Sequence, residues 1–319
     1  MPKIIIGVLR GGPSSEYEVS LKTGENVLKF LSPRYTAYDI LITKDGKWHL
    51  NGLEKPPEKI LRGIDVVFNA LHGEYGEDGK VQLLLEDLKI PFTGSKSVSS
   101  AMAMNKFLAR QIFEKAGIKI PQGFIINKND DVTRTAFKIF KKFSPPWVLK
   151  PLNKGSSVGV EIIYKFSDLK KAIDWMFFSY GKILFEEYIK GREATCAVLE
   201  NFRGEKIYAF PSVEIIPDAA KKFFDYEAKY GGKTREICPS NFPLSVKKEI
   251  ENIAKKAHGA LNCSGYSRCD FIVSPRGIFL LELNSLPGLT SESLLPKSAE
   301  AAGLDFSELL SHLINCALK

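Results

Sequence analysis

Short apolar runs and amphipathic stretches alternate along the first third of the chain. Residues 4–9 form a continuous apolar run, which is typical of a strand buried on both faces of a parallel sheet. Residues 19–31 have helical periodicity, and further strands are predicted at 38–43 and 65–71. Strands separated by a helix in this order predict an α/β domain over residues 1–96.

The rest of the chain divides into two smaller units of α+β type. One covers residues 97–186 and opens with a helix predicted at 97–116, and the other covers residues 187–319. Within the last unit, residues 217–239 are polar, weakly periodic and rich in aromatic side chains. A loop of this length inside a compact domain is usually functional, so we predict that this segment is a lid.

Two strands near the C-terminus, at 266–273 and 278–283, carry the densest set of polar side chains. Side chains alternate between the faces of a strand, so Asp270 shares a face with Arg268, and Glu282 shares one with Asn284. Oxygen atoms of Asp, Glu and Asn suit a hard cation such as Mg²⁺. The alternative is a solvated sheet face, but Leu280, Leu281 and Leu283 indicate a buried strand.

The loop between these strands decides which side chains face each other. A three-residue loop over 275–277, with Gly277 in the left-handed conformation, pairs Asp270 with Glu282. A loop of two or four residues would put Leu281 opposite Asp270 instead. Two carboxylates facing each other are stable when a cation lies between them, so we predict the three-residue loop. The same register pairs Arg268 with Asn284.

Glycine-rich segments at 11–15, 72–79 and 154–160 follow predicted strands. Backbone N–H groups in such loops bind anions, and ligands of open α/β sheets bind at the carboxyl ends of strands. None of the three is a GxGxxG or a Walker A motif. Segment 154–160 is either a flexible hairpin or a phosphate loop, and Lys150 at the end of the preceding strand favours the second reading. Glu16 either complements a helix dipole or holds a substrate ammonium group.

Composition narrows the class of protein. The 319 residues include 26% charged residues and carry a net charge of +8, with the two signs interspersed, so nucleic-acid binding is not indicated. Five cysteines without a CxxC motif fit a reducing compartment. The N-terminus has no signal-peptide pattern, and no apolar run reaches the roughly 18 residues of a membrane helix. We therefore expect a cytoplasmic protein that does not contact membranes.

Seven segments together resemble one family. The chain is similar, from about residue 7 to 296, to ATP-grasp enzymes and specifically to D-alanine–D-alanine ligases. No single segment decides this resemblance, but their order and spacing are specific. They are GGPSSEYEVS at 11–20, HGEYGEDG at 72–79, MNKFLAR at 104–110, KGSSVGV at 154–160, FFDYEAKY at 223–230, RCD at 268–270 and LELNSLPGLTSES at 281–293.

The resemblance implies a fold, a reaction and partners. The expected architecture is three-domain ATP-grasp, with ATP between two α+β domains. The expected reaction joins two D-alanines through a D-alanyl phosphate, for peptidoglycan precursor synthesis and hence cell shape. Two Mg²⁺ or Mn²⁺ ions, activation by K⁺ and a homodimer are implied as well. Lys229 and Tyr230 in the lid favour the peptide product, and the alternative is a different second substrate such as D-lactate or D-serine.

The resemblance also assigns roles to individual residues. Those expected to bind ATP are Lys106, Lys150, Gly155, Ser156, Ser157, Val158, Glu186, Glu187, Tyr188, Ile189 and Glu193. Those expected to bind the metal ions are Asp270, Glu282 and Asn284. Those expected to bind the two D-alanines or to act in catalysis are Glu16, His72, Ser156, Lys229, Tyr230, Arg268, Gly288, Ser293 and Leu294. Among the last set, Glu16, Ser156 and Tyr230 are expected to form one hydrogen-bonded set, and Arg268 and Gly288 to stabilise an oxyanion.

Overall fold

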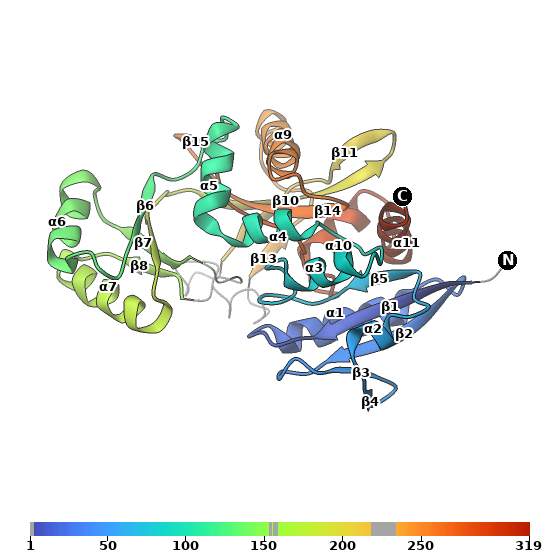
Figure 1. Cartoon of the computed structure of the whole chain (residues 1–319). Coiled ribbons are helices and arrows are strands. Elements are labelled where there is room, and N and C mark those ends of the chain that lie inside the picture. The colour runs from blue at the N-terminus through green and yellow to red at the C-terminus, as the bar shows by residue number, and fades with distance from the viewer. Residues whose placement is uncertain (1–2, 153–154, 156–158, 218–233) are drawn as a thin grey trace.

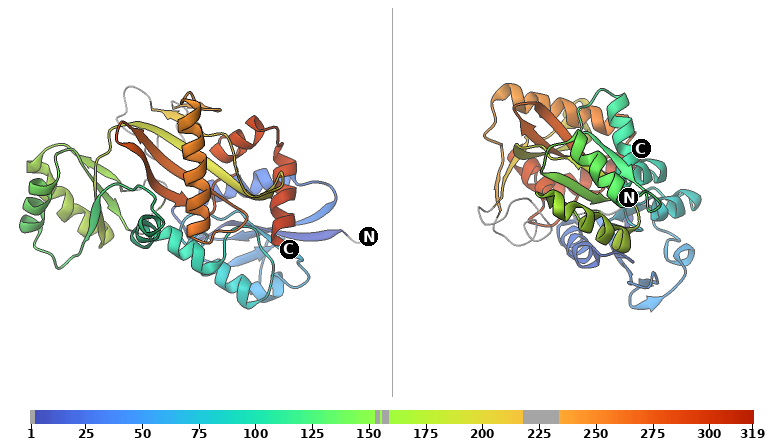
Figure 2. Two further views of the ribbon diagram at one scale, coloured as in Figure 1. Left: turned by 90° about the horizontal axis from the view of Figure 1, so that it is seen from above. Right: turned by 90° about the vertical axis from the view of Figure 1, so that its left-hand side faces the viewer.

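The computed structural model describes residues 3–152, 155, 159–217 and 234–319 of the chain. These residues form three β-sheets with helices packed on them, which confirms the mixed α/β class (Figure 1). Seen from above, the four-stranded sheet and its helices form a lobe at one end, and both termini lie at the other (Figure 2). No helix among the described residues is long and apolar enough to cross a membrane.

The first sheet contains the N-terminal strand at its centre. Its strand order is β4-β3-β2-β1-β5, and β1 is parallel to both β2 and β5. The apolar residues predicted from the sequence fill the core around β1, including Ile6, Val8 and Leu9. The elements are β1 Ile4–Gly11, α1 Tyr17–Phe30, β2 Tyr35–Ile42, β3 Trp48–Leu50, β4 Leu53–Glu54, α2 Pro57–Ile60, β5 Val66–Asn69 and α3 Lys80–Asp87.

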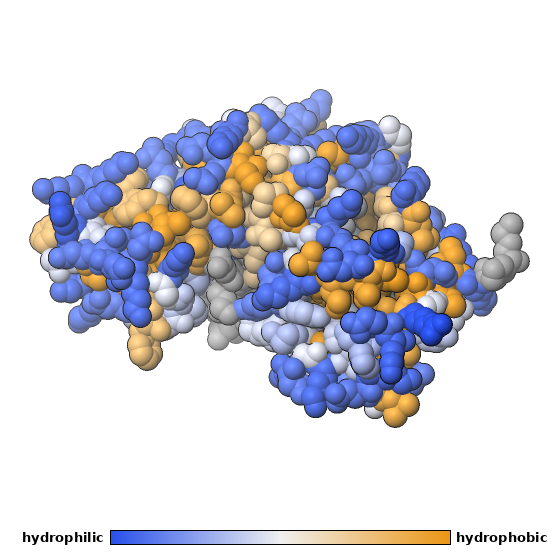
Figure 3. Space-filling view, in the orientation of Figure 1, coloured by the Kyte–Doolittle hydropathy of each residue, from blue (hydrophilic) through white to orange (hydrophobic). Residues whose placement is uncertain are grey.

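The four-stranded sheet is antiparallel and has its own core. Its order is β6-β9-β7-β8, and Trp147 and Phe185 are fully buried between the sheet and two helices. The strands are β6 Gly123–Ile126, β7 Trp147–Pro151, β8 Glu161–Ile163 and β9 Ile183–Glu187, and the helices are α6 Val132–Lys142 and α7 Phe166–Tyr180. In the space-filling view, hydrophilic side chains cover most of the face of the molecule that Figure 3 shows, with apolar patches between them.

The six-stranded sheet holds the C-terminal half together. Strand β10 pairs with β11, β12 and β14, and β14 pairs with β15. The strands are β10 Arg192–Phe202, β11 Glu205–Ala209, β12 Val213–Ile216, β13 Arg235–Ile237, β14 Tyr266–Ser274 and β15 Gly277–Asn284. The helices are α9 Leu244–Ala260, α10 Leu294–Ala301 and α11 Phe306–Ala317. Residues of α11 share a core with β1 and β5, which joins this half of the chain to the first sheet.

The helix predicted at 97–116 is two helices, α4 Ser97–Met104 and α5 Lys106–Lys115. Asn105 interrupts the run because its backbone is extended and its side chain caps α5, accepting from the N–H groups of Phe107 and Leu108. Both helices contact β15 of the six-stranded sheet, although the expected central unit at 97–186 includes them. The division into three units at 96 and 186 stays a prediction.

The C-terminal hairpin confirms the predicted pairing of polar side chains. Asp270 lies opposite Glu282, and Arg268 lies opposite Asn284. The loop, however, is one residue shorter than predicted, because Ser274 pairs with Gly277. That prediction was therefore wrong about the turn and correct about the register beyond it.

A β-bulge reconciles the shorter loop with the pairing. Between Asp270 and Phe271 the register shifts, since Phe271 faces Leu280 while Asp270 faces Glu282. Leu281 is the extra residue on β15. Bulges often lie beside active sites, where they turn a side chain towards the site. Here the bulge keeps both carboxylates on one face, and the periodicity of the sequence could not show it.

The five cysteines are all free thiols. Burial raises the pKa of the Cys196 and Cys269 thiols well above the usual value, and they lie opposite each other on β10 and β14. Residues 218–233 of the predicted lid lie outside the described residues. At its end the structure shows β13, which the sequence pattern did not predict.

Candidate active site

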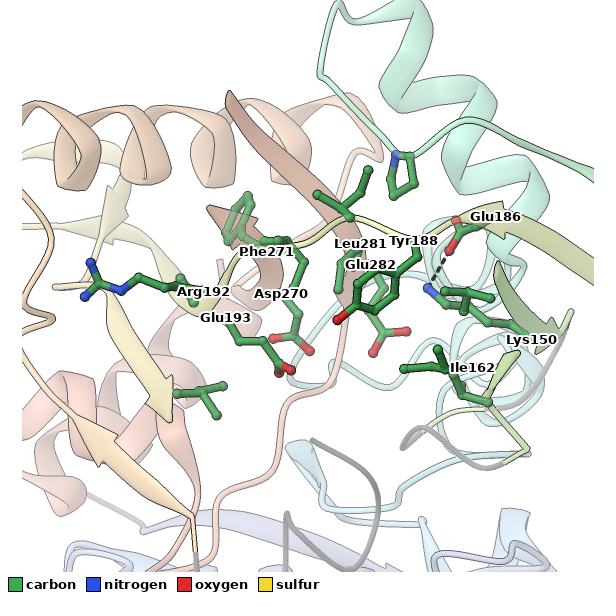
Figure 4. Close-up of a pocket in the computed structure, with 18 of the residues that line it drawn as sticks. Lys150, Ile162, Glu186, Tyr188, Arg192, Glu193, Asp270, Phe271, Leu281 and Glu282 are labelled. Atoms are coloured by element: carbon green, nitrogen blue, oxygen red, sulfur yellow. Dashed lines mark ion pairs between the residues drawn. The ribbon is translucent and has the colours of Figure 1, made fainter. Parts of the chain in front are cut away.

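A cavity of about 470 Å³ lies between the four-stranded and six-stranded sheets (Figure 4). Strands β7, β8 and β9 line it from one sheet, and β10, β12, β14 and β15 line it from the other. Apolar side chains such as Val148, Ile162 and Leu281 share its walls with charged groups. The sequence-predicted residues that line it are Lys106, Lys150, Glu186, Glu187, Tyr188, Ile189, Glu193, Asp270 and Glu282.

Glu186 is the most buried acid of this cavity, with only 2% of its surface exposed. Lys150 Nζ lies 2.6 Å from its Oε2, and Arg110 Nη1 donates to its Oε1. Arg110 also donates from Nη2 to the carbonyl of Pro121 at 2.6 Å. A buried carboxylate is costly unless it is paired, and the two cations supply that pairing.

Asp270 is surrounded by hydrogen-bond donors. Arg268 forms a bidentate pair with it, Nε to Oδ1 at 2.9 Å and Nη2 to Oδ2 at 2.8 Å. Thr195 Oγ1 donates to Oδ1 at 2.8 Å, and Asn284 Nδ2 donates to Oδ2 at 3.2 Å. The planar guanidinium fork fixes the Arg268 side chain beside the carboxylate.

Glu282 faces the same space from β15. Its Oε2 lies 3.6 Å from Lys106 Nζ, which extends from the start of α5. In Figure 4 the carboxylates of Glu193, Asp270 and Glu282 point into one opening, across from the Lys150–Glu186 pair. Within the described residues no group of three or more His, Cys, Asp and Glu side chains could hold a metal ion. The candidate metal ligands are two carboxylates and the Asn284 amide, and magnesium sites often use one or two carboxylates plus substrate phosphates.

The N-terminal loops meet at Glu16, which is 7% exposed. A Cβ on Gly73 would lie 2.8 Å from Glu16 Oε2, and one on Gly155 would lie 3.2 Å from the same atom. Gly73 of the 72–79 loop and Gly155 therefore both lie close to this carboxylate. His72 is buried beside them, with Nε2 2.8 Å from Thr23 Oγ1.

The segment after β15 forms a second cluster of predicted residues. A Cβ on Gly288 would lie 2.8 Å from Ser293 Oγ, which accepts a hydrogen bond from the Thr290 N–H at 3.0 Å. Leu294, at the start of α10, packs against Val213 and Ile215 of β12. Ser156, Ser157, Val158, Lys229 and Tyr230 lie outside the described residues, so their roles stay predictions.

The comparisons with known proteins agree with this geometry. The family model described as D-ala D-ala ligase C-terminus matches residues 112–315, and the model described as D-ala D-ala ligase N-terminus matches residues 5–60 and 52–95. A D-alanine–D-alanine ligase of Syntrophobacter fumaroxidans is 40% identical, over 99% of this chain and 98% of the relative. The chain belongs to the D-alanine–D-alanine ligase family.

Solved structures of this ligase family have the same fold. A D-alanine–D-alanine ligase of Bacillus anthracis, complexed with ATP, has a TM-score of 0.82 and 34% identity, covering 100% of this chain and 98% of that one. The VanG D-Ala:D-Ser ligase of Enterococcus faecalis has a TM-score of 0.85 and 30% identity, covering 99% and 100%. ATP-grasp architecture, as predicted from the sequence, is confirmed.

Two residues of this ligase site were missed from the sequence. Arg110 lies four residues after Lys106 on α5, a spacing that places both on one helix face, so this signal was present in the sequence. Thr195 supports Asp270 from the neighbouring strand β10, where Thr195 and Asp270 are paired. No local pattern marks Thr195, because its role depends on a strand pairing between distant segments.

Proposed function

We propose that this protein is an ATP-dependent D-alanine–D-alanine ligase that supplies the dipeptide for peptidoglycan precursors. The observation that carries the proposal is the meeting of two carboxylates and a buried Lys150–Glu186 pair in one cavity, with Asp270 facing Glu282. A nucleotide has an apolar base and charged phosphates, and this cavity offers apolar walls and charged groups together.

The proposed reaction has two steps. The carboxylate of the first D-alanine attacks the γ-phosphorus of ATP, which releases ADP and gives D-alanyl phosphate. The amine of the second D-alanine then attacks the acyl carbon, and the tetrahedral intermediate expels inorganic phosphate as the peptide bond forms. The amine loses a proton in this step. Each transition state gathers negative charge, which positioned cations and N–H groups stabilise.

Residues of this chain are assigned to each part of that reaction. Lys106 and Lys150 would bind ATP phosphates, and Glu186 would accept from the adenine amino group. Glu16 would hold the ammonium of the first D-alanine, whose carboxylate would lie near His72. Arg268 and the Gly288 N–H would stabilise the oxyanion, and Ser293 and Leu294 would seat the second D-alanine. The shared cavity supports the roles of Lys106, Lys150 and Glu186, and the approach of Gly73 and Gly155 to Glu16 supports the role of Glu16.

The donor atoms also fit the metal that the family implies. Asp270, Glu282 and Asn284 present oxygen atoms from facing or adjacent positions of one hairpin, and hard oxygen donors suit Mg²⁺ or Mn²⁺. Such ions, when bound, would neutralise the phosphate oxygens of ATP. Asp270 already accepts hydrogen bonds from Arg268, Thr195 and Asn284, so a bound ion would share this carboxylate with those donors. Activation by K⁺, a homodimer and a cytoplasmic location are further parts of the proposal.

Assaying the reaction with purified protein, ATP, Mg²⁺ and D-alanine tests the proposal. We expect one phosphate released for each D-alanyl-D-alanine formed, with phosphate release at background when D-alanine is omitted. Release that is independent of D-alanine or Mg²⁺ would contradict it. Because a D-Ala:D-Ser ligase is also similar to this chain, D-serine and D-lactate are compared as second substrates. A preference for either at neutral pH would mean that the second substrate is not D-alanine, contrary to the proposal.

Replacing Arg110 is expected to weaken nucleotide binding. Arg110→Met leaves buried Glu186 with Lys150 as its described cationic neighbour and frees the Pro121 carbonyl. Removing one partner of a buried ion pair costs about 3–5 kcal/mol, and we expect the lower end because Lys150 remains. The KM for ATP should rise about tenfold or more, and the melting temperature should fall. Arg110→Lys keeps the charge and is the control; equal effects of both variants would contradict a charge-based role.

A further inference from the structure

Two neighbouring acids on β9 bind two different arginines that lie on the side of the six-stranded sheet. Side chains alternate along a strand, so Glu186 and Glu187 point to opposite faces of β9. Glu186 faces the cavity and Arg110 of α5. Glu187 is instead bonded to Arg276, with Nη1 2.7 Å from its Oε2 and Nη2 3.3 Å from its Oε1. Arg276 lies in the turn of the β14–β15 hairpin, between Ser274 and Gly277.

The chain passes between the two sheets beside this ion pair. On the way in, Leu280 N–H donates to the Lys119 carbonyl at 2.9 Å, which ties Lys119 to β15. Three residues later, Gln122 accepts from the Glu187 N–H at 2.8 Å and donates its own N–H to Glu187 Oε1 at 2.9 Å. The Glu187 side chain therefore joins three parts of the chain: the segment around Gln122, the end of β9 and the turn of the β14–β15 hairpin. Lys119 Nζ also donates to the Arg276 carbonyl.

The chain returns from β9 through residues 188–191, and the fit there is tight. A Cβ on Gly191 would lie 2.4 Å from the Val273 carbonyl oxygen, so this segment runs directly against β14. Tyr188 and Ile189 within it line the cavity. A change in the angle between the two sheets would therefore move these residues and the Lys150–Glu186 wall relative to Asp270 and Glu282.

The Glu187 carboxylate is charged at neutral pH. Burial raises the pKa of Glu187, but hydrogen bonds from Arg276 and the Gln122 N–H outweigh burial and leave the pKa below its usual value. Arg276 is half exposed, with 53% of its side-chain surface accessible. Glu187 is more covered, with 13% of its side-chain surface accessible, and the pair contributes only modestly to stability because its guanidinium lies in solvent. Because it joins β9 of one sheet to the β14–β15 turn of the other, the pair can instead affect how the two sheets are arranged.

We propose that Glu187 and Arg276 are positioning residues whose ion pair sets the angle between the two sheets and thereby the width of the nucleotide cavity. This rests on the proposed function, because ATP is the ligand whose binding reports that width. Glu187 was expected from the sequence to bind ATP, and it does line the cavity, but its carboxylate is bonded to Arg276 and to the Gln122 N–H. Both sheets line the cavity, so a small rotation between them would change which of their groups one ATP molecule contacts at the same time.

A charge-reversal cycle tests the proposal. We expect Glu187→Lys and Arg276→Glu each to raise the dissociation constant of ATP about tenfold by calorimetry, which requires no turnover. The KM for ATP should rise in parallel, with kcat at saturating ATP within about threefold of the unchanged protein. The double variant, which restores opposite charges, should return both constants to within about threefold. Melting temperatures of all three should stay within a few degrees.

A second ion pair supplies the matched control. Lys255 Nζ on α9 lies 2.5 Å from Glu205 Oε2 on β11, with 32% and 47% of the two side-chain surfaces exposed, and neither residue lines the cavity. Lys255→Glu and Glu205→Lys should leave ATP binding unchanged. Unchanged ATP binding in both Glu187→Lys and Arg276→Glu, or additive losses in the double variant, would overturn the proposal. If the unchanged protein binds ATP but forms no dipeptide, the proposed function fails while the cycle still tests the positioning role.

Discussion

Glu282→Gln is expected to lower kcat by at least about 10³-fold at saturating ATP and D-alanine. The substitution keeps the size of the side chain and removes its charge. Glu282 faces Asp270 across the hairpin and its Oε2 lies 3.6 Å from Lys106 Nζ, so under the proposed function its charge would act on both the metal and a phosphate-binding lysine. The side chain is partly exposed, so loss of the charge should cost little stability. Steady-state kinetics with a Mg²⁺ titration measures the effect.

The control for this variant changes a glutamate outside the cavity in the same way. Glu251 lies on α9, and burial raises its pKa above the usual value, so it is also a partly desolvated acid. Glu251→Gln should leave kcat and the Mg²⁺ dependence unchanged. If Glu282→Gln stays within tenfold of the unchanged protein and keeps its Mg²⁺ dependence, the metal role assigned to Glu282 is wrong.

The sequence predicted those parts of the fold that depend on local pattern. The strand β1, predicted at 4–9, and the shared face of Arg268 and Asp270 followed from the alternation of side chains and from hydrophobic periodicity. The break at Asn105 did not, because helical periodicity continues across it and only the capping geometry interrupts the helix. Helix α10 was also missed, although Ser293 stands at its N-terminal end.

The candidate site shows the same limit at the level of side chains. The pairing of Asp270 with Glu282 could be predicted because opposed carboxylates need a cation between them. The bulge at Leu281, which makes this pairing compatible with a short turn, could not be predicted, because it depends on how two strands compensate each other. The outward direction of Glu187 follows from alternation, but its partner Arg276 is 89 residues away and only the folded chain brings them together.

The cations of the site form two groups, which are paired with acids on opposite walls of the cavity. Lys150 and Arg110 are held by buried Glu186, which fixes one wall of the cavity. Arg268 is held by Asp270 on the opposite wall. A cation already paired with a carboxylate is oriented before the substrate binds, so little reorganisation is needed as negative charge develops. Substitution of these two groups should therefore affect different stages of the reaction.

Arg268→Lys is expected to lower kcat about 10²–10³-fold, with a small change in the KM for ATP. Lysine keeps a positive charge beside Asp270, so the melting temperature should change little. It cannot reproduce the bidentate contact, in which two nitrogens reach the two oxygens of Asp270 at 2.9 and 2.8 Å. The oxyanion of the tetrahedral intermediate then loses its oriented donor.

The stoichiometry of the products separates this role from a structural one. If Arg268 acts on the second step, D-alanyl phosphate forms but is transferred slowly, and water hydrolyses part of it. We therefore expect more than one phosphate released for each dipeptide formed by Arg268→Lys. Thr195→Val is the matched variant, because it removes a 2.8 Å hydrogen bond to Asp270 and leaves Arg268 in place. It should lower kcat less than about tenfold and keep the ratio at one; a ratio of one in Arg268→Lys would place the loss before acyl transfer and refute the oxyanion role.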